Sequence, residues 1–186
     1  LGLDFYPQFV EELRAHAAEL GVADRVTARV GDMKALDLPP ASFDLVWCEG
    51  AIYVLGFKQG LEVVRPLLRG PGLVALTDAT WLLPRSEVPA DVLAFWDAEC
   101  PHMVGIDENL ELARSVGYRP LGHFTLPAAA WAAYVDPLER RMNEVLAQHP
   151  GDPDAEEAAR KERREFAMFR SNLRYFGYVF FLLQRC

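Results

Sequence analysis

The sequence has few cysteines, and their spacing excludes two classes of protein. Its 186 residues contain three cysteines, Cys48, Cys100 and Cys186. Because they are odd in number and far apart, they support neither a disulfide framework nor a paired metal-ligand motif. A reducing compartment fits this usage, so we predict a cytoplasmic location and no bound metal.

A surplus of basic residues is also missing. Lys and Arg number 19 against 27 Asp and Glu, which gives a formal net charge of -8. Proteins that bind phosphate backbones or anionic lipid surfaces carry clustered Lys and Arg. We therefore expect neither nucleic acid nor a membrane as a partner.

Long apolar runs are absent as well. The longest, Tyr178 to Leu183, is far shorter than the roughly 20 residues that a membrane-spanning helix needs, and it suits a buried strand. We also find no charged-then-apolar leader. With 51% hydrophobic residues, the chain is long enough for one core, so we predict a single domain over residues 1–186 with insertions at about 79–105 and 127–173.

The first half alternates helical and strand patterns. Apolar residues recur at helical spacing between Tyr6 and Leu20, with Pro7 in the first turn and Gly21 as the stop. Arg25 to Val30 then favours a strand, which Gly31-Asp32 ends.

The next elements continue this rhythm. Phe43 to Cys48 has the composition of a central parallel strand. A covering helix should carry Leu61, Val64 and Leu68, followed by a turn at Gly70-Pro71-Gly72. Leu73 to Leu76 then predicts a buried strand that ends at Thr77-Asp78.

The second half is less regular. Segment Ala79 to Gly105 is rich in Trp and Pro and predicts a lid. Within the lid we expect a helix at 90–99. After the lid we expect, in order, a helix at 107–115, a strand at 118–126, a helix at 127–148, a helix capped by Asp152 or Asp154, and a strand at 175–184. In the last helix, Glu156 with Arg160 and Glu157 with Lys161 are spaced for ion pairs on a solvated face.

Four fragments occur in order along the first half: Gly2-Leu3-Asp4, Gly31-Asp32-Met33, Phe43 to Gly50, and Arg69 to Leu76. From Leu1 to about Thr80 this series resembles the class I S-adenosylmethionine-dependent methyltransferases, in particular the small-molecule branch that is similar to quinone-biosynthesis enzymes. The resemblance implies an α/β fold with a Rossmann-like, doubly wound, mostly parallel sheet. It also implies helical lid insertions and an antiparallel C-terminal strand at the sheet edge.

The cofactor implied by the resemblance is S-adenosylmethionine. Asp4 directly follows a short strand, where a carboxylate can bind both hydroxyls of a ribose; alternatively it caps the helix that follows. Asp32 can accept a hydrogen bond from an adenine amino group while Met33 packs on the ring, or it is a turn aspartate. Phe5, Cys48 and Glu49 belong to the same implied cofactor site.

Two residues are candidates for catalysis. Glu49 leaves the tip of the predicted central strand and can orient or deprotonate a nucleophile, unless it is a loop glutamate bound to backbone amides. His102 in the lid can act as a base near neutral pH, although a lone histidine is more often structural. Cys48 has no basic partner beside it, which favours a small buried residue over a thiol nucleophile.

Aromatic side chains are suited to hold a flat or apolar methyl acceptor, and their π faces also attract a sulfonium or an ammonium group. The predicted acceptor site consists of Tyr53, Trp81, Trp96 and Tyr134. Trp131 has the spacing of a core residue. The same aromatic lid and an apolar helix face are equally compatible with a homodimer.

In the family, a first strand and a Gly-rich turn precede the part that begins at Gly2, and their absence from this sequence is the largest departure. Without that strand, the strands ending at Asp4 and Cys48 would have unpaired edges. Upstream residues, an inserted partner strand or another closure of the sheet would satisfy those edges, and we favour the first. Two other functions stay open: a non-catalytic adenosyl-binding module and a nicotinamide-dependent oxidoreductase. The sequence has no Tyr-x-x-x-Lys pair, which an oxidoreductase of this kind would need.

Overall fold

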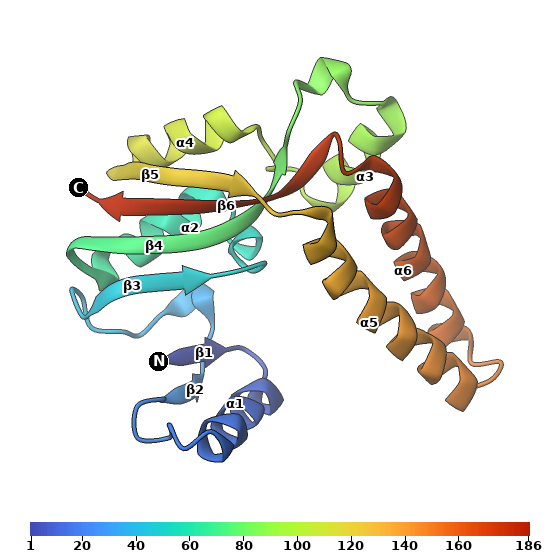
Figure 1. Cartoon of the computed structure of the whole chain (residues 1–186), viewed down its shortest axis with the longest axis horizontal. Helices are drawn as coiled ribbons and strands as arrows, with labels where there is room; N and C mark the ends of the chain where they lie inside the picture. The colour runs from blue at the N-terminus through green and yellow to red at the C-terminus, as the bar shows by residue number, and fades with distance from the viewer. The chain divides into compact units, whose positions relative to one another are not determined.

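The computed structural model describes residues 1–186, and their contacts group into an N-terminal unit, Leu1–Ser42, and a C-terminal unit, Phe43–Cys186. Figure 1 traces both units along the chain. The expected α/β class is confirmed, but the strands form a two-stranded and a four-stranded sheet. The predicted division into one domain with two insertions stays a prediction.

The N-terminal unit is a strand, helix and strand. Strand β1 (Gly2–Asp4) pairs in parallel with β2 (Ala28–Val30), and helix α1 (Pro7–Glu19) connects them. Val10 and Ala17 are the buried residues of α1. The helix is confirmed, whereas the strand predicted from Arg25 begins at Ala28, because residues 22–25 form a turn in which Arg25 and Val26 donate to Val22 O.

The C-terminal unit contains a mixed sheet with the order β3-β4-β6-β5 (Figure 1). Its strands are β3 (Phe43–Cys48), β4 (Leu68–Trp81), β5 (Tyr118–Thr125) and β6 (Phe176–Arg185). Strand β3 is parallel to β4, and β6 is antiparallel to both β4 and β5. The antiparallel C-terminal strand is confirmed, but its predicted place is wrong: β6 is inside the sheet and β5 is at the edge.

Strand β4 is longer than the sequence predicted. The partner on β4 moves from Leu68 to Leu73 while β3 advances only from Phe43 to Leu45. The extra residues around Gly70-Pro71-Gly72 therefore form an irregularity within the strand, not a turn before it. At its other end β4 continues past Asp78 to Trp81, because β6 pairs with it all the way to Phe176.

Helices α2 (Phe57–Val64) and α4 (Ile106–Ser115) cover one face of this sheet. Leu61, Ala113 and Phe181 are fully buried in the core between these helices and the strands. The predicted covering helix is shorter than expected, because Pro66 follows α2 and Leu68 already begins β4.

A second core lies where the last part of β4 meets three helices. These are α3 (Ala90–Glu99), α5 (Ala128–Gln148) and α6 (Pro153–Asn172). Its buried aromatic members include Trp96, Trp131, Phe169 and Phe176. The predicted helices at 90–99 and 127–148 are confirmed, as is Asp152 as the cap of α6, where its Oδ1 accepts from Asp154 N at 2.9 Å.

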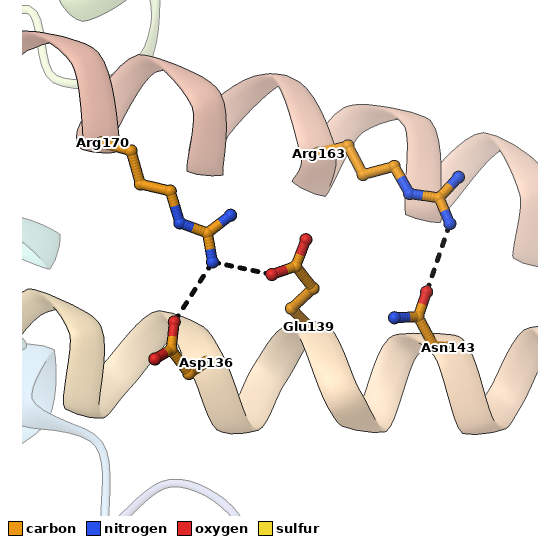
Figure 2. Close-up of polar contacts among 5 residues, drawn as sticks. All are labelled: Asp136, Glu139, Asn143, Arg163 and Arg170. Carbon is orange, nitrogen blue, oxygen red and sulfur yellow. Dashed lines mark hydrogen bonds and ion pairs between the residues drawn. The ribbon is translucent and has the colours of Figure 1, made fainter.

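Helices α5 and α6 run side by side and are joined by polar contacts (Figures 1 and 2). Arg170 on α6 donates to Asp136 Oδ1 at 3.1 Å and to Glu139 Oε2 at 2.7 Å, both on α5. Further along, Arg163 donates to Asn143 Oδ1 at 3.2 Å. The hairpin is therefore held by charged contacts along its exposed side.

The ion pairs predicted within α6 are wrong in detail. Arg160 pairs with Glu157 at 2.7 Å, three residues away, so that neither Glu156 nor Lys161 has an ion-pair partner. Both spacings bring side chains together on a helix, and the rotamer of Arg160 decides between them. No helix of the chain combines the length and apolarity that crossing a bilayer requires.

Candidate functional site

Two carboxylates lie at one edge of the small N-terminal sheet. Asp4 is the last residue of β1 and pairs in register with Val30, the last residue of β2. Asp32 follows two residues later, and Gly31 N donates to Asp4 O at 2.9 Å. The structure thus brings Asp4 and Asp32 to the carboxyl ends of adjacent parallel strands, the edge at which α/β sheets bind ligands.

Each carboxylate is oriented by one local hydrogen bond. Asp4 Oδ1 accepts from Tyr6 N and Asp32 Oδ1 from Lys34 N, both at 2.8 Å. In this way Asp32 caps a short 3-10 helix, Met33–Ala35. The second oxygen of each carboxylate makes no bond to protein, so the turn role and a ligand role are compatible in both residues.

The surroundings of this edge are apolar and tightly fitted. A Cβ at position 31 would lie 2.9 Å from the Leu3 side chain, so a larger residue there would require Leu3 to shift. Phe5 is 62% exposed beside Asp4, and Met33 is half-buried beside Asp32. An adenosyl group would meet carboxylate oxygens and an apolar surface here.

In the C-terminal unit, the tip of β3 is tied to β4. Gly50, which has a φ of 60°, donates its backbone N–H to Thr77 Oγ1 at 2.9 Å. Glu49 Oε1 accepts from Trp47 Nε1 at 2.6 Å, and Glu49 is exposed. The Cys48 thiol is half-buried, and burial raises its pKa above the ordinary value. It is therefore held as the neutral thiol.

Two cavities adjoin at this tip. One of 320 Å³ is lined by Glu49, Gly50, Thr77, Leu126, Ala130, Trp131, Tyr134 and Tyr178. The other, of 270 Å³, is lined by Gly50, Tyr53, Ala79, Trp96, Glu99, Cys100, Trp131, Tyr134, Glu165, Phe169 and Tyr178. They share Gly50, Trp131, Tyr134 and Tyr178, so we treat them together as the aromatic cleft.

Acidic groups surround the aromatic cleft. Burial raises the pKa of Asp78, next to Thr77 on β4, from 3.8 to about 7. Burial also raises the pKa of Glu165, and the charges of Glu162 and Glu99 raise it further against an opposing effect of Lys161. No Lys, Arg or His side chain lines either cavity. The cleft is therefore aromatic and negatively charged.

The structure places four of the six predicted acceptor and catalytic residues in the aromatic cleft and two outside it. Tyr53, Trp96, Tyr134 and Glu49 all line the aromatic cleft. Trp81 does not: it is 3% exposed, and its Nε1 donates to Met103 O at 3.1 Å, which closes the segment between them into a loop. His102 is exposed and lines neither cavity.

Sequence reasoning missed several residues of the cleft, namely Thr77, Glu99, Glu165 and Tyr178, and the neighbouring Asp78. A polar Thr-Asp pair inside an otherwise apolar strand was a usable signal, which we assigned to the strand end. The others come from separate helices and strands, and no sequence spacing relates them. No cluster of three or more His, Cys, Asp or Glu side chains is placed to hold a metal ion.

Residues 1–72 match the family model described as a methyltransferase domain. No curated protein sequence matches the chain. Among solved structures, an S-adenosylmethionine-dependent methyltransferase from Geobacter sulfurreducens in complex with S-adenosyl-L-homocysteine has a TM-score of 0.83 at 25% identity, covering 100% of this chain and 74% of that chain.

A similar enzyme from Thiobacillus denitrificans, also in complex with S-adenosyl-L-homocysteine, has a TM-score of 0.79 at 22% identity, covering 100% of this chain and 75% of that chain. The chain has the fold of S-adenosylmethionine-dependent methyltransferases. That fold also serves other chemistry: the [4+2]-cyclase SpnF has a TM-score of 0.73 at 14% identity, covering 99% of this chain and 64% of that chain. The likeness to SpnF concerns the fold alone.

Proposed function

We propose that the chain is part of an S-adenosylmethionine-dependent methyltransferase that acts on a small-molecule acceptor. The observation that carries the proposal is the methyltransferase-domain match over residues 1–72, which includes Asp4, Asp32 and the Glu49-Gly50 tip. The complexes of two structural relatives with S-adenosyl-L-homocysteine support the choice of cofactor.

In this proposal Asp4 binds the ribose hydroxyls and Asp32 the adenine amino group, each through the oxygen that its local turn leaves free. Phe5 and Met33 supply apolar contact. When bound, S-adenosylmethionine supplies an electrophilic methyl group on a sulfonium. The acceptor binds in the aromatic cleft of the C-terminal unit, where burial by Trp96 and Trp131 excludes water.

Methyl transfer by in-line displacement needs alignment more than covalent help. Glu49 is the group that we assign to orient the acceptor, because it lines the cleft at the β3 tip. His102 would have to move to reach the acceptor. Of the two candidates, we therefore assign the catalytic role to Glu49 before His102.

The test is calorimetric titration with S-adenosyl-L-homocysteine. Asp4→Asn and Asp32→Asn each keep an oxygen for the local turn but remove the charge and one acceptor. Each should weaken binding at least several-fold, whereas Asp24→Asn, an exposed change in the same unit, should not. If neither variant binds more weakly than Asp24→Asn, the adenosine assignment is wrong.

Turnover separates the enzyme from the alternative function. A methyl-transfer assay with S-adenosylmethionine and a panel of amines, phenols and carboxylic acids should yield a methylated product that is lost in Asp4→Asn. Cofactor binding without any product over the whole panel would instead favour a non-catalytic adenosyl-binding module.

A further inference from the structure

The inner cavity of the aromatic cleft has an unusual combination of walls. Six aromatic side chains line its 270 Å³: Tyr53, Trp96, Trp131, Tyr134, Phe169 and Tyr178. This volume is near the lower end of the roughly 300–1,000 Å³ of small-molecule sites. It suits a ligand of few heavy atoms.

The rings form one packed cluster. Trp131 lies 4.6 Å from Phe169 and 5.1 Å from Tyr178 between ring centroids, and Trp96 stacks on Phe169 at 5.9 Å. Trp96 and Trp131 are each 6% exposed, while Tyr134 is 59% exposed. The cavity therefore has a fixed aromatic floor and a tyrosine at its mouth.

Two carboxylates lie in the same wall without a cationic partner. Glu99 on α3 and Glu165 on α6 line the cavity, and neither takes part in an ion pair. The Arg side chains of this region pair elsewhere: Arg85 with Asp97 and Arg170 with Asp136 and Glu139. Burial raises the pKa of Glu165, and the charges of Glu162 and Glu99 raise it further, against an opposing effect of Lys161.

A further polar group is unsatisfied at this site. The Nε1 of Trp96 is buried without a hydrogen-bond partner, and its ring lines the cavity. Buried indole N–H groups normally have an acceptor. An ammonium nitrogen cannot accept this hydrogen bond, so the donor requires an oxygen acceptor, such as a hydroxyl group of the same ligand.

We propose that this cavity binds an organic ammonium group and that the methyl acceptor is accordingly a small amine. Aromatic faces attract cations, and desolvation strengthens that attraction. A neutral flat acceptor would leave the half-buried Glu165 without a counter-charge inside the cavity, and a carboxylate or phosphate acceptor would be repelled by Glu165 and by the exposed Glu99. An ammonium group matches both the rings and the charges.

The identity of the amine as methyl acceptor rests on the proposed function. A bound ammonium first gives a proton to solvent water through a wall carboxylate, which frees the nitrogen lone pair. That lone pair then forms the N–CH₃ bond as the bond between methyl carbon and sulfur breaks. The sulfur keeps the bonding electron pair as a neutral thioether, and the positive charge passes to nitrogen.

The test compares two ligands of one shape. Choline carries a quaternary nitrogen, and 3,3-dimethylbutan-1-ol carries a carbon in its place. Calorimetric titration should show choline binding at least tenfold more tightly. Equal binding of the two, or no binding of choline, overturns the proposal.

Variants locate the effect. Glu165→Gln should weaken choline binding at least fivefold and leave the alcohol unchanged. Glu157→Gln makes the same charge change on the same helix, away from the cavity, and should leave both unchanged. At the exposed mouth, Tyr134→Phe should keep choline binding and Tyr134→Leu should lose it. Equal losses in Glu165→Gln and Glu157→Gln overturn the assignment of Glu165.

A third titration separates this inference from the proposed function. S-adenosyl-L-homocysteine and choline should bind together without competition. Competition would make the cavity part of the cofactor site and overturn the acceptor assignment. Choline binding without any binding of S-adenosyl-L-homocysteine would keep the ammonium site and reject the methyltransferase, whereas the reverse result would reject the ammonium site alone.

Discussion

The backbone N–H of Gly50 donates to the hydroxyl of Thr77 at 2.9 Å, so the loop that leaves β3 is fixed to the neighbouring strand β4. Thr77 is 2% exposed, and both residues line the aromatic cleft. The Thr77 hydroxyl thus holds the loop after β3 against the buried strand β4. We expect this bond to help position residues 49–53, including Glu49 and Tyr53, which line the cleft.

Thr77→Val should therefore lower both stability and ligand binding. The valine keeps the volume but leaves Gly50 N–H without its partner; because Gly50 is exposed and water can replace part of the bond, the loss is about 0.5–1.5 kcal/mol. Urea unfolding should show this loss, and choline titration should show weaker binding. Thr77→Ser keeps the hydroxyl and is the control. Identical binding by the Val and Ser variants would show that the bond does not shape the cleft.

Asp78 should make the protein less stable as pH rises. Its pKa is about 7 in the fold against an ordinary 3.8, so the charged form is disfavoured by burial. The penalty is absent below the unfolded pKa, grows as pH rises from 3.8 to 7, and is constant above. At about 1.4 kcal/mol per pKa unit, its full size is roughly 4 kcal/mol.

Asp78→Asn tests this linkage. The stability gained over the parent protein should increase by about 2–3 kcal/mol between pH 5 and pH 8 in urea unfolding. Asp24→Asn, an exposed control, should show a much smaller pH dependence. A gain that does not change with pH would mean that Asp78 stays charged, or stays neutral, throughout this range.

Much of this architecture could be predicted from the sequence because its signals are local. Pro89 and Pro101 bracket α3, and Asp152 with Pro153 marks the start of α6. The carboxylates Asp4 and Asp32 could be placed at one sheet edge because Asp4 ends one strand of a parallel pair and Asp32 lies two residues past the end of the other. These assignments need only neighbouring residues.

The aromatic cleft could not be predicted in full because its walls come together only through tertiary packing. Tyr178 was expected in an edge strand, yet β6 lies between β4 and β5, which places this tyrosine against Trp131. Glu165 belongs to a charge run most of whose other members are exposed. Only the fold shows that this glutamate lines the aromatic cleft.

Arg170 should contribute stability that depends on salt and pH. It bridges Asp136 and Glu139 on the neighbouring helix (Figure 2), and the hydrogen bond from Arg170 lowers the pKa of Glu139. Because that pKa is depressed in the fold, the contribution is present above the ordinary glutamate pKa and is lost as pH falls through the folded value.

Arg170→Met should accordingly lower the melting temperature slightly at pH 7 and low salt. The difference should disappear in 1 M NaCl, where the screening length is about 3 Å, and also at pH 3. Arg164→Met, on the same helix and without an ion pair, is the matched control. An equal loss in both variants at every salt concentration would show that packing, not charge, explains the effect of Arg170.

Gly117 should be the glycine least tolerant of substitution among those at helix ends. It ends α4 with a φ of 84°, and a Cβ there would lie 2.8 Å from Arg65 Nε. Gly21 ends α1 with a φ of 66° and has open space around it. Gly21→Ala should thus cost about 1–2 kcal/mol from left-handed backbone strain alone. Gly117→Ala should cost a little more in urea unfolding, because the end of the half-buried Arg65 side chain must also shift; equal costs would mean that Arg65 moves freely.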